Sequence, residues 1–284
     1  MKNIAKKFNL KLIGIILLFS FIIPLFLLGM ENFSLSPKYL QVQSVESNNI
    51  EQSNAKKEVV SSFSTDYSNS PSARKYNIRL ALKSLDNVVV KGGEEFSFNK
   101  VVGKRTEERG YKKALVIFKG SYVEGVGGGV CQVSTTLYNA WLLAGLDAVN
   151  VKAHTLPASY VDLSRDATVS EYIDLVLRNP YDNDVVIKTE YDDNKITIKI
   201  LGKNRGFKYT LKSEILETIP FEEDIIELDE IGENEQFNGK DGYVSRLILS
   251  VVKGDRVVAK RELRKDYYKP QNSVKILRKS PLNW

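Results

Sequence analysis

Residues 125–150 read GVGGGVCQVSTTLYNAWLLAGLDAVN. A glycine-rich turn comes first, and apolar side chains then recur every three or four residues, which predicts a helix over 132–144. Gly145 is well placed to end that helix. Over residues 149–154 apolar and polar side chains alternate, which predicts a strand. A helix followed directly by a two-residue period indicates an α+β fold.

The same patterns extend to both sides of this stretch. Ser70 and Pro71 suit the start of a second amphipathic helix over 72–86. Short strands are predicted at residues 88–90, 96–98, 172–177, 185–189 and 196–200, and a hairpin is predicted over 247–264. The sequence therefore predicts two helices against a mainly antiparallel sheet, with a β-rich extension at the C-terminal end.

The N-terminal 30 residues predict a membrane anchor. Residues 12–30 are uncharged and mostly apolar, and at 1.5 Å per residue they span roughly 28 Å, close to the hydrocarbon core of a bilayer. Four lysines precede this segment and Glu31 follows it, so the positive-inside rule places the rest of the chain outside the cell. A cleaved signal peptide is the alternative, with the same outside location.

Composition excludes several classes of protein. Four of the 41 basic residues lie in residues 1–30, which hold no acidic residue, so the rest of the chain is close to neutral. A nucleic-acid partner is therefore not expected. With one Cys and one His, neither an internal disulfide nor a Cys/His zinc site can form, and no metal or other cofactor is expected.

Composition also suggests the domain boundaries. Residues 1–30 are the anchor with its basic cytoplasmic tail, and 31–58, rich in Ser, Asn, Gln and Glu, are a flexible linker. Residues 59–202 are the predicted catalytic domain, and 203–284 are the extension, in which an acidic stretch precedes the hairpin. The acidic stretch is interpreted as a solvated strand face with a loop, since its spacing fits no Ca²⁺-binding loop.

Cys131 falls in the first turn of the central helix, where free backbone N–H groups and the helix dipole stabilise a thiolate. The same N–H groups could hold an oxyanion. His154 follows on the polar side of the predicted strand, and a helix-start cysteine facing a histidine is the arrangement of papain-like nucleophiles. The alternative is that Cys131 is a small buried hydrophobe and that His154 is a surface residue or a hydrogen-bonded core residue.

The residues around Cys131 are candidates for contact with a substrate. Glycines allow close backbone approach to another molecule, and the residues that follow are unusually polar for a helix that is apolar further on. The candidates of these two kinds are Gly128, Gly129, Gln132, Ser134 and Thr135.

Several motifs resemble the VanW family. The longest is GGGVCQVSTTLYNA at residues 127–140, followed by His-Thr-Leu-Pro at 154–157 and Arg-Asp-Ala-Thr-Val at 165–169. Shorter ones are Asn-Ile-Arg at 77–79 and Phe-Ser-Phe-Asn at 96–99. The resemblance covers about residues 60–202. Members often have His-Ser-Leu-Pro-Val where this chain has His-Thr-Leu-Pro-Ala.

The resemblance implies a cell-wall L,D-transpeptidase, an enzyme that joins two peptidoglycan stem peptides by a 3–3 link. The family's cysteine maps to Cys131, the acyl acceptor, and its histidine to His154, the acid and base. Asp166 or Ser159 would orient His154, and Arg105 and Arg165 would bind carboxylates of the stem peptides. Two alternatives remain, a wall peptidase that uses the same thiol and a non-catalytic wall-binding module.

Overall fold

The computed structural model describes residues 57–118, 121–231 and 233–279. The predicted anchor and nearly all of the predicted linker lie outside the described residues. Within the described part, no helix is both long enough and apolar enough to cross a membrane. The fold is α+β and rich in strands, with mainly antiparallel sheets.

The largest sheet has the order β1-β9-β8-β2, and all its neighbours are antiparallel. Its strands are β1 (Glu58–Asp66), β9 (Lys195–Gly202), β8 (Val185–Tyr191) and β2 (Val89–Val90). Alternate side chains of β9 face the core, and three isoleucines there are fully buried: Ile196, Ile198 and Ile200. The two-residue period of the sequence thus places one face of this sheet in the core.

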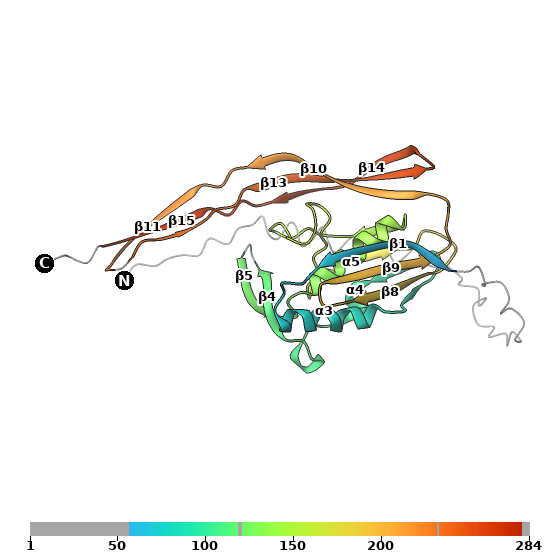
Figure 1. Ribbon diagram of the computed structural model, residues 1–284, viewed down its shortest axis with the longest axis horizontal. Coiled ribbons are helices and arrows are strands. Elements are labelled where there is room, and N and C mark those ends of the chain that lie inside the picture. Colours follow the sequence, from blue (N-terminus) through green and yellow to red (C-terminus); the bar gives the residue numbers. More distant parts are fainter. Residues whose placement is uncertain (1–56, 119–120, 232, 280–284) are drawn as a thin grey trace, which may run out of the picture. The chain divides into compact units, whose positions relative to one another are not determined.

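Two long helices match the predicted ones. The helix α3 (Ser72–Leu85) buries one apolar stripe, as an amphipathic helix does. The helix α5 (Val130–Leu143) begins two residues earlier than predicted and is buried on nearly all sides. Figure 1 shows α5 beside the sheet that contains β1 and β9. The helix that carries Cys131 is therefore part of the hydrophobic core.

The segment before α5 contains more elements than the sequence suggested. The strand predicted at 96–98 is β3 (Glu95–Ser97), which ends one residue earlier. It ends there because the Ser97 hydroxyl accepts a hydrogen bond from the Lys100 amide and so caps a short helix, α4 (Phe98–Val102). A turn of 3-10 helix (Glu107–Arg109) follows. The hairpin β4 (Lys113–Phe118) and β5 (Ser121–Val126) then leads into the glycine turn.

Two strand predictions after α5 were too long. The strand β6 (Asp147–Asn150) ends four residues before His154, where its pairing with β7 (Val176–Arg178) stops. Residues 151–175 contain no helix or strand, so the predicted strand at 172–177 survives only at its end. His154 therefore lies in a loop, not on a strand, and other contacts must hold it.

The C-terminal extension consists of two sheets. The first has the antiparallel order β10-β13-β14, from β10 (Lys208–Ile219), β13 (Gly242–Lys253) and β14 (Arg256–Tyr268), and so contains the predicted hairpin. It packs on α5 and contributes the fully buried Leu247 to the core. At Gly145 an added Cβ would lie 2.2 Å from the ring of Tyr209, so only glycine allows β10 to approach the end of α5 this closely.

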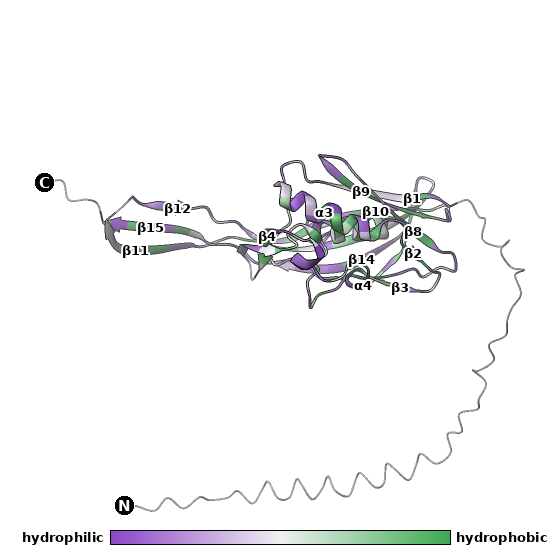
Figure 2. Cartoon of the chain, turned by 90° about the horizontal axis from the view of Figure 1, so that it is seen from below, coloured by the Kyte–Doolittle hydropathy of each residue, from purple (hydrophilic) through white to green (hydrophobic). Residues whose placement is uncertain are grey.

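The second sheet of the extension has the order β11-β15-β12, from β11 (Glu223–Ile231), β15 (Ser273–Lys279) and β12 (Glu235–Phe237). The β11–β15 pair is parallel. Figure 2 shows this sheet as one layer with alternating hydrophilic and hydrophobic residues. The acidic stretch runs through β10 and β11, which confirms its interpretation as an exposed strand face.

Candidate functional site

A groove with a volume of about 1630 Å³ passes over the start of α5. Its walls come from the start of α3, the loop after α4, the β4–β5 hairpin and two segments of the 151–175 loop. Cys131 and His154 both line the groove. Pockets for single small ligands usually measure about 300–1,000 Å³, so this groove is large enough for more than one peptide segment.

Cys131 is the second residue of α5 and is partly exposed. Its Sγ lies 3.3 Å from the carbonyl oxygen of Val169 and 3.5 Å from the amide nitrogen of the same residue. The amides of Val130 and Gln132 donate to the carbonyls of Gly127 and Gly129. Among the described residues, the N–H of Cys131 itself has no acceptor. It could therefore bind the oxyanion that forms when the sulfur attacks a carbonyl group.

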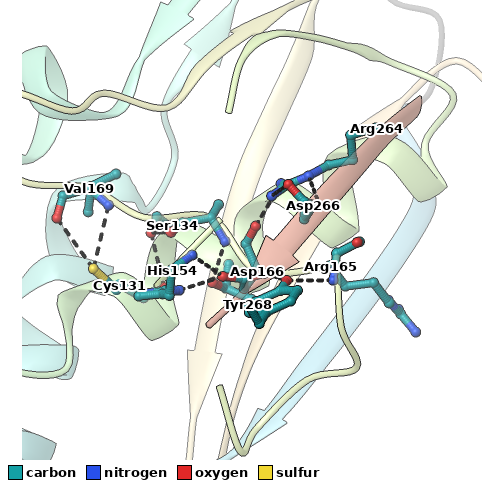
Figure 3. Close-up of polar contacts among 12 residues, drawn as sticks. Cys131, Ser134, His154, Arg165, Asp166, Val169, Arg264, Asp266 and Tyr268 are labelled. Atoms are coloured by element: carbon teal, nitrogen blue, oxygen red, sulfur yellow. Dashed lines mark hydrogen bonds and ion pairs between the residues drawn. The ribbon is translucent and has the colours of Figure 1, made fainter. Parts of the chain in front are cut away.

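His154 is fixed by one carboxylate. One oxygen of Asp166 accepts hydrogen bonds from both the backbone N–H and the ring Nδ1 of His154, each at 2.6 Å. Both residues are buried, with 7% and 1% of their surfaces exposed. Because Nδ1 is occupied, the Nε2 atom is the one available to the thiol. Figure 3 shows His154 bonded to Asp166, and Cys131 bonded to Val169.

The electrostatics of the pair favour charge separation. Burial acts to raise the pKa of Cys131, but the hydrogen bond and charge of His154, with smaller effects of Val169 and Arg105, hold it below its usual value of 9.0. Burial acts to lower the pKa of His154, but its hydrogen bonds to Asp166 and Cys131 raise it to about 10. Both shifts favour a thiolate beside an imidazolium, the reactive form of such pairs.

Asp166 is in turn held by the C-terminal extension. The hydroxyl of Tyr268, the last residue of β14, donates to the second oxygen of Asp166 at 2.6 Å and accepts from the Ser164 amide at 2.7 Å. Arg264 of the same strand donates to the Asp166 carbonyl and pairs with Asp266. Burial acts to raise the pKa of Asp166, but the hydrogen bonds from His154 and Tyr268 hold it below the usual value.

Three of the residues predicted to contact a substrate make hydrogen bonds within the protein. Ser134 donates to the carbonyls of Cys131 and Ala167, and Thr135 accepts from the Ala167 amide, so both fully buried hydroxyls hold the 151–175 loop on α5. Gln132 lines the groove, but its amide is bonded on both sides. It links β1, through Thr65 and the Asp66 carbonyl, to Arg74.

Gly128 packs against the backbone of β4, where an added Cβ would lie 2.7 Å from the Leu115 carbonyl oxygen, and it does not line the groove. Gly129 does line the groove. The polar character of the start of α5 therefore reflects buried hydrogen bonds more than contact with a ligand.

The two predicted carboxylate-binding arginines are placed differently. Arg165 lies outside the groove, where it stacks on Phe63 and binds Asn139 and Asp162. Arg105 lines the groove. Ser159 also lines it, but the atoms that orient His154 belong to Asp166.

Two residues of the site were missed in the sequence analysis. Arg74, in the first turn of α3, reaches the groove and donates to Gln132. Tyr268 lies 102 positions from Asp166. Arg264, Asp266 and Tyr268 have the two-residue spacing that puts side chains on one face of a strand, and this is the signal that could have identified the group.

Comparisons with known proteins agree with these motifs. Residues 73–201 match the family model described as VanW like protein. These residues form a VanW domain. The VanW domain contains Cys131, His154 and Asp166, and its strand β9 pairs with β1, which precedes the matched residues. In the part of the chain that the structure describes, no group of three His, Cys, Asp or Glu residues is suited to hold a metal ion.

Two curated relatives match the chain around the VanW domain. The uncharacterized protein YoaR of Bacillus subtilis is 46% identical over 129 residues, which cover 45% of this chain and 43% of YoaR. The vancomycin B-type resistance protein VanW of Enterococcus faecalis is 35% identical over 127 residues, which cover 43% of this chain and 46% of that protein. The chain thus spans less than half the length of each of these relatives.

One solved structure also matches part of the chain. The crystal structure of HP0197-G5 is 22% identical, and the match covers 25% of this chain and 97% of that one. Its TM-score of 0.15 is too low to support a structural inference.

Proposed function

We propose that the VanW domain is a cysteine-dependent acyltransferase that forms 3–3 cross-links in peptidoglycan, an L,D-transpeptidase. The observation that carries the proposal is that Cys131, at the start of a buried helix, lines the same groove as His154, whose ring is held by Asp166 and whose charge lowers the pKa of the thiol. The name of the Enterococcus faecalis relative, a vancomycin resistance protein, supports a cell-wall context. With residues 12–30 as an anchor, the domain would face the wall.

In the first half-reaction the Cys131 thiolate attacks the carbonyl carbon of the third residue of a donor stem peptide. The Cys131 N–H binds the oxyanion of the tetrahedral intermediate. As the C–N bond to the fourth residue breaks, His154 Nε2 gives its proton to the leaving amine. A thioester remains on Cys131, and the terminal amino acid departs.

In the second half-reaction an amine of an acceptor stem attacks the thioester. His154, now neutral, takes a proton from the attacking nitrogen, and the C–S bond breaks to restore the thiolate–imidazolium pair. Asp166 stabilises the imidazolium and keeps its ring in place in both steps. A groove of about 1630 Å³ offers room for donor and acceptor on opposite sides of the sulfur.

Incubation of the protein with peptidoglycan fragments, followed by mass analysis, tests the proposal. The expected product is a 3–3 dimer, and the expected intermediate is an acyl group on Cys131. The Cys131→Ala variant should keep its melting temperature within a few degrees, because the site is at a helix start and little volume is lost, yet it should make no dimer. Cys131→Ser should also be nearly inactive.

Three results would contradict the assignment. A folded Cys131→Ala variant that still makes the dimer would exclude the thioester route. A parent protein that only shortens stem peptides would instead be a thiol peptidase with water as acceptor. A thiol that reacts no faster than free cysteine and forms no acyl adduct would favour a non-catalytic wall-binding module.

A further inference from the structure

Two arginines flank the glycine turn that leads to Cys131. Arg74 comes from the first turn of α3, and Arg105 comes from the loop after α4. Both line the groove together with the sulfur. They are far apart in the sequence, and the fold brings them to the same end of α5.

The glycines make room for these two side chains. An added Cβ at Gly127 would lie 2.7 Å from the Cβ of Arg105, and one at Gly129 would lie 2.9 Å from the Cγ of Arg74. Both glycines have positive φ angles, 85° and 106°. The turn before the nucleophile therefore keeps the aliphatic parts of both arginines close to the start of the helix.

In the part of the chain that the structure describes, neither guanidinium forms an ion pair with a carboxylate, although the charge of Asp174 acts on Arg105. Arg74 donates through Nη1 to Ser70 and Gln132, and Arg105 donates through Nη1 to Asn99 and the Gly103 carbonyl, so all four acceptors are uncharged. A guanidinium carries five N–H groups, so each arginine keeps donors for a further partner.

Both charges are also partly removed from water. Burial lowers the pKa of Arg74 and of Arg105. Tyr160 and Cys131 partly offset this effect at Arg74, and Cys131, Tyr111 and Asp174 partly offset it at Arg105. Buried charges in proteins are normally paired. Arg74 and Arg105 are half-buried cations beside the thiol, and among the described residues their hydrogen bonds go only to neutral groups, so each can still pair with the anion of a ligand.

We propose that Arg74 and Arg105 form a carboxylate-binding site that holds a carboxylate of the donor peptide next to the attacked carbonyl. The planar fork of arginine matches a carboxylate with two parallel hydrogen bonds. The substrate class is then a peptide with a free carboxylate close to the scissile bond, either the C-terminal one of the leaving residue or one on the side chain of the acylated residue. This inference rests on the proposed acyl transfer for its substrate.

The carboxylate site can be tested without turnover, by alkylation of Cys131 in the full-length chain. Iodoacetate carries a carboxylate and iodoacetamide carries a neutral amide, and both need the thiolate, so the ratio of their rates cancels the thiolate fraction. The parent protein should show a higher ratio than N-acetylcysteine. Arg105→Gln and Arg74→Gln should each lower the ratio about tenfold, as expected for the loss of a hydrogen bond to a charged group.

Arg79→Gln is the matched control. Arg79 also lies on α3, but it pairs with Asp193 outside the groove, so the ratio should not change. The His154 imidazolium attracts iodoacetate in every variant, so the fall in the ratio is the decisive result. A parent ratio equal to that of N-acetylcysteine, or a ratio unchanged in both groove variants, would overturn the proposal.

A second measurement needs no variant. N-acetylalanine should slow the iodoacetamide reaction of the parent protein in a saturable way, and its amide should not. Equal effects of the acid and the amide would overturn the site, even if an arginine variant failed to fold.

Donor peptides amidated at either carboxylate then identify the group that is bound. The amidation that slows acylation of Cys131 marks the carboxylate held by the arginines, and no effect of either amidation would overturn its role in the substrate. If no peptide acylates Cys131 at all, the proposed function fails, while the alkylation ratio still decides whether the site exists.

Discussion

The Tyr268→Phe substitution removes a single hydroxyl from the buried side of Asp166. That hydroxyl donates to one carboxylate oxygen at 2.6 Å and accepts from the Ser164 amide at 2.7 Å. A hydrogen bond to a charged group contributes about 1.5–3 kcal/mol, and a buried amide left without an acceptor costs about 1 kcal/mol or more. We therefore expect the free energy of unfolding to fall by about 3 kcal/mol at neutral pH.

The loss should depend on pH with a definite sign. The pKa of Asp166 is lower in the folded protein than the usual 3.8, so its charged interactions stabilise the fold above that value. This stability is lost as the pH falls through the lower pKa of the folded state, where the carboxyl becomes protonated. The difference between parent and Tyr268→Phe should therefore be full at neutral pH and shrink in acid.

Urea unfolding at several pH values measures this difference, and the alkylation rate of Cys131 reports on its interaction with His154. With a less firmly held Asp166, His154 should be a weaker partner for the thiol, and alkylation near neutral pH should slow. Tyr267→Phe is the matched control, because Tyr267 is the preceding residue of β14 and 57% exposed. If the two variants matched in both stability and thiol reactivity, the extension would have no part in holding the site.

Two further predictions concern the same helix start. His154→Ala should move the pH profile of Cys131 alkylation upward toward that of a free thiol, near pH 8.5, and should slow acyl transfer by about 10²–10⁴-fold; an unchanged profile would remove His154 from the site. Gly129→Ala should destabilise the protein by more than Gly93→Ala in thermal melts. Both glycines have positive φ angles, but an added Cβ meets Arg74 and Ile78 at 2.9 Å in the first and nothing within 4 Å in the second. Equal losses would mean that close packing at Gly129 contributes little.

The sequence predicted the parts of the fold that depend on local period. The helices α3 and α5 and the alternating strands β8, β9 and β13 each bury a face set by their own residues. Cys131 and His154 could be paired as candidates because the chain has one of each. Their contact, however, depends on a loop with no regular period, so the sequence wrongly placed His154 on a strand.

Polar residues in the core were the main source of error. Gln132, Ser134 and Thr135 resemble exposed residues in the sequence, yet 1% or less of each is exposed, because partners from β1 and the 151–175 loop satisfy their hydrogen bonds. Arg165 was misplaced for the same reason. No local pattern distinguishes a polar side chain that binds a ligand from one that binds a distant segment of its own chain.

The dependence of the site on distant segments explains why the extension belongs to the working unit. The loop that carries His154 and Asp166 has no secondary structure of its own, and Asp166 can fix His154 only if Asp166 is itself fixed. Its second oxygen is held by Tyr268, which belongs to a sheet whose strand β10 packs on α5, the helix that carries Cys131. The geometry of the thiol and the imidazole is therefore a property of the fold from β1 to β14, which is longer at both ends than the segment that matches the family.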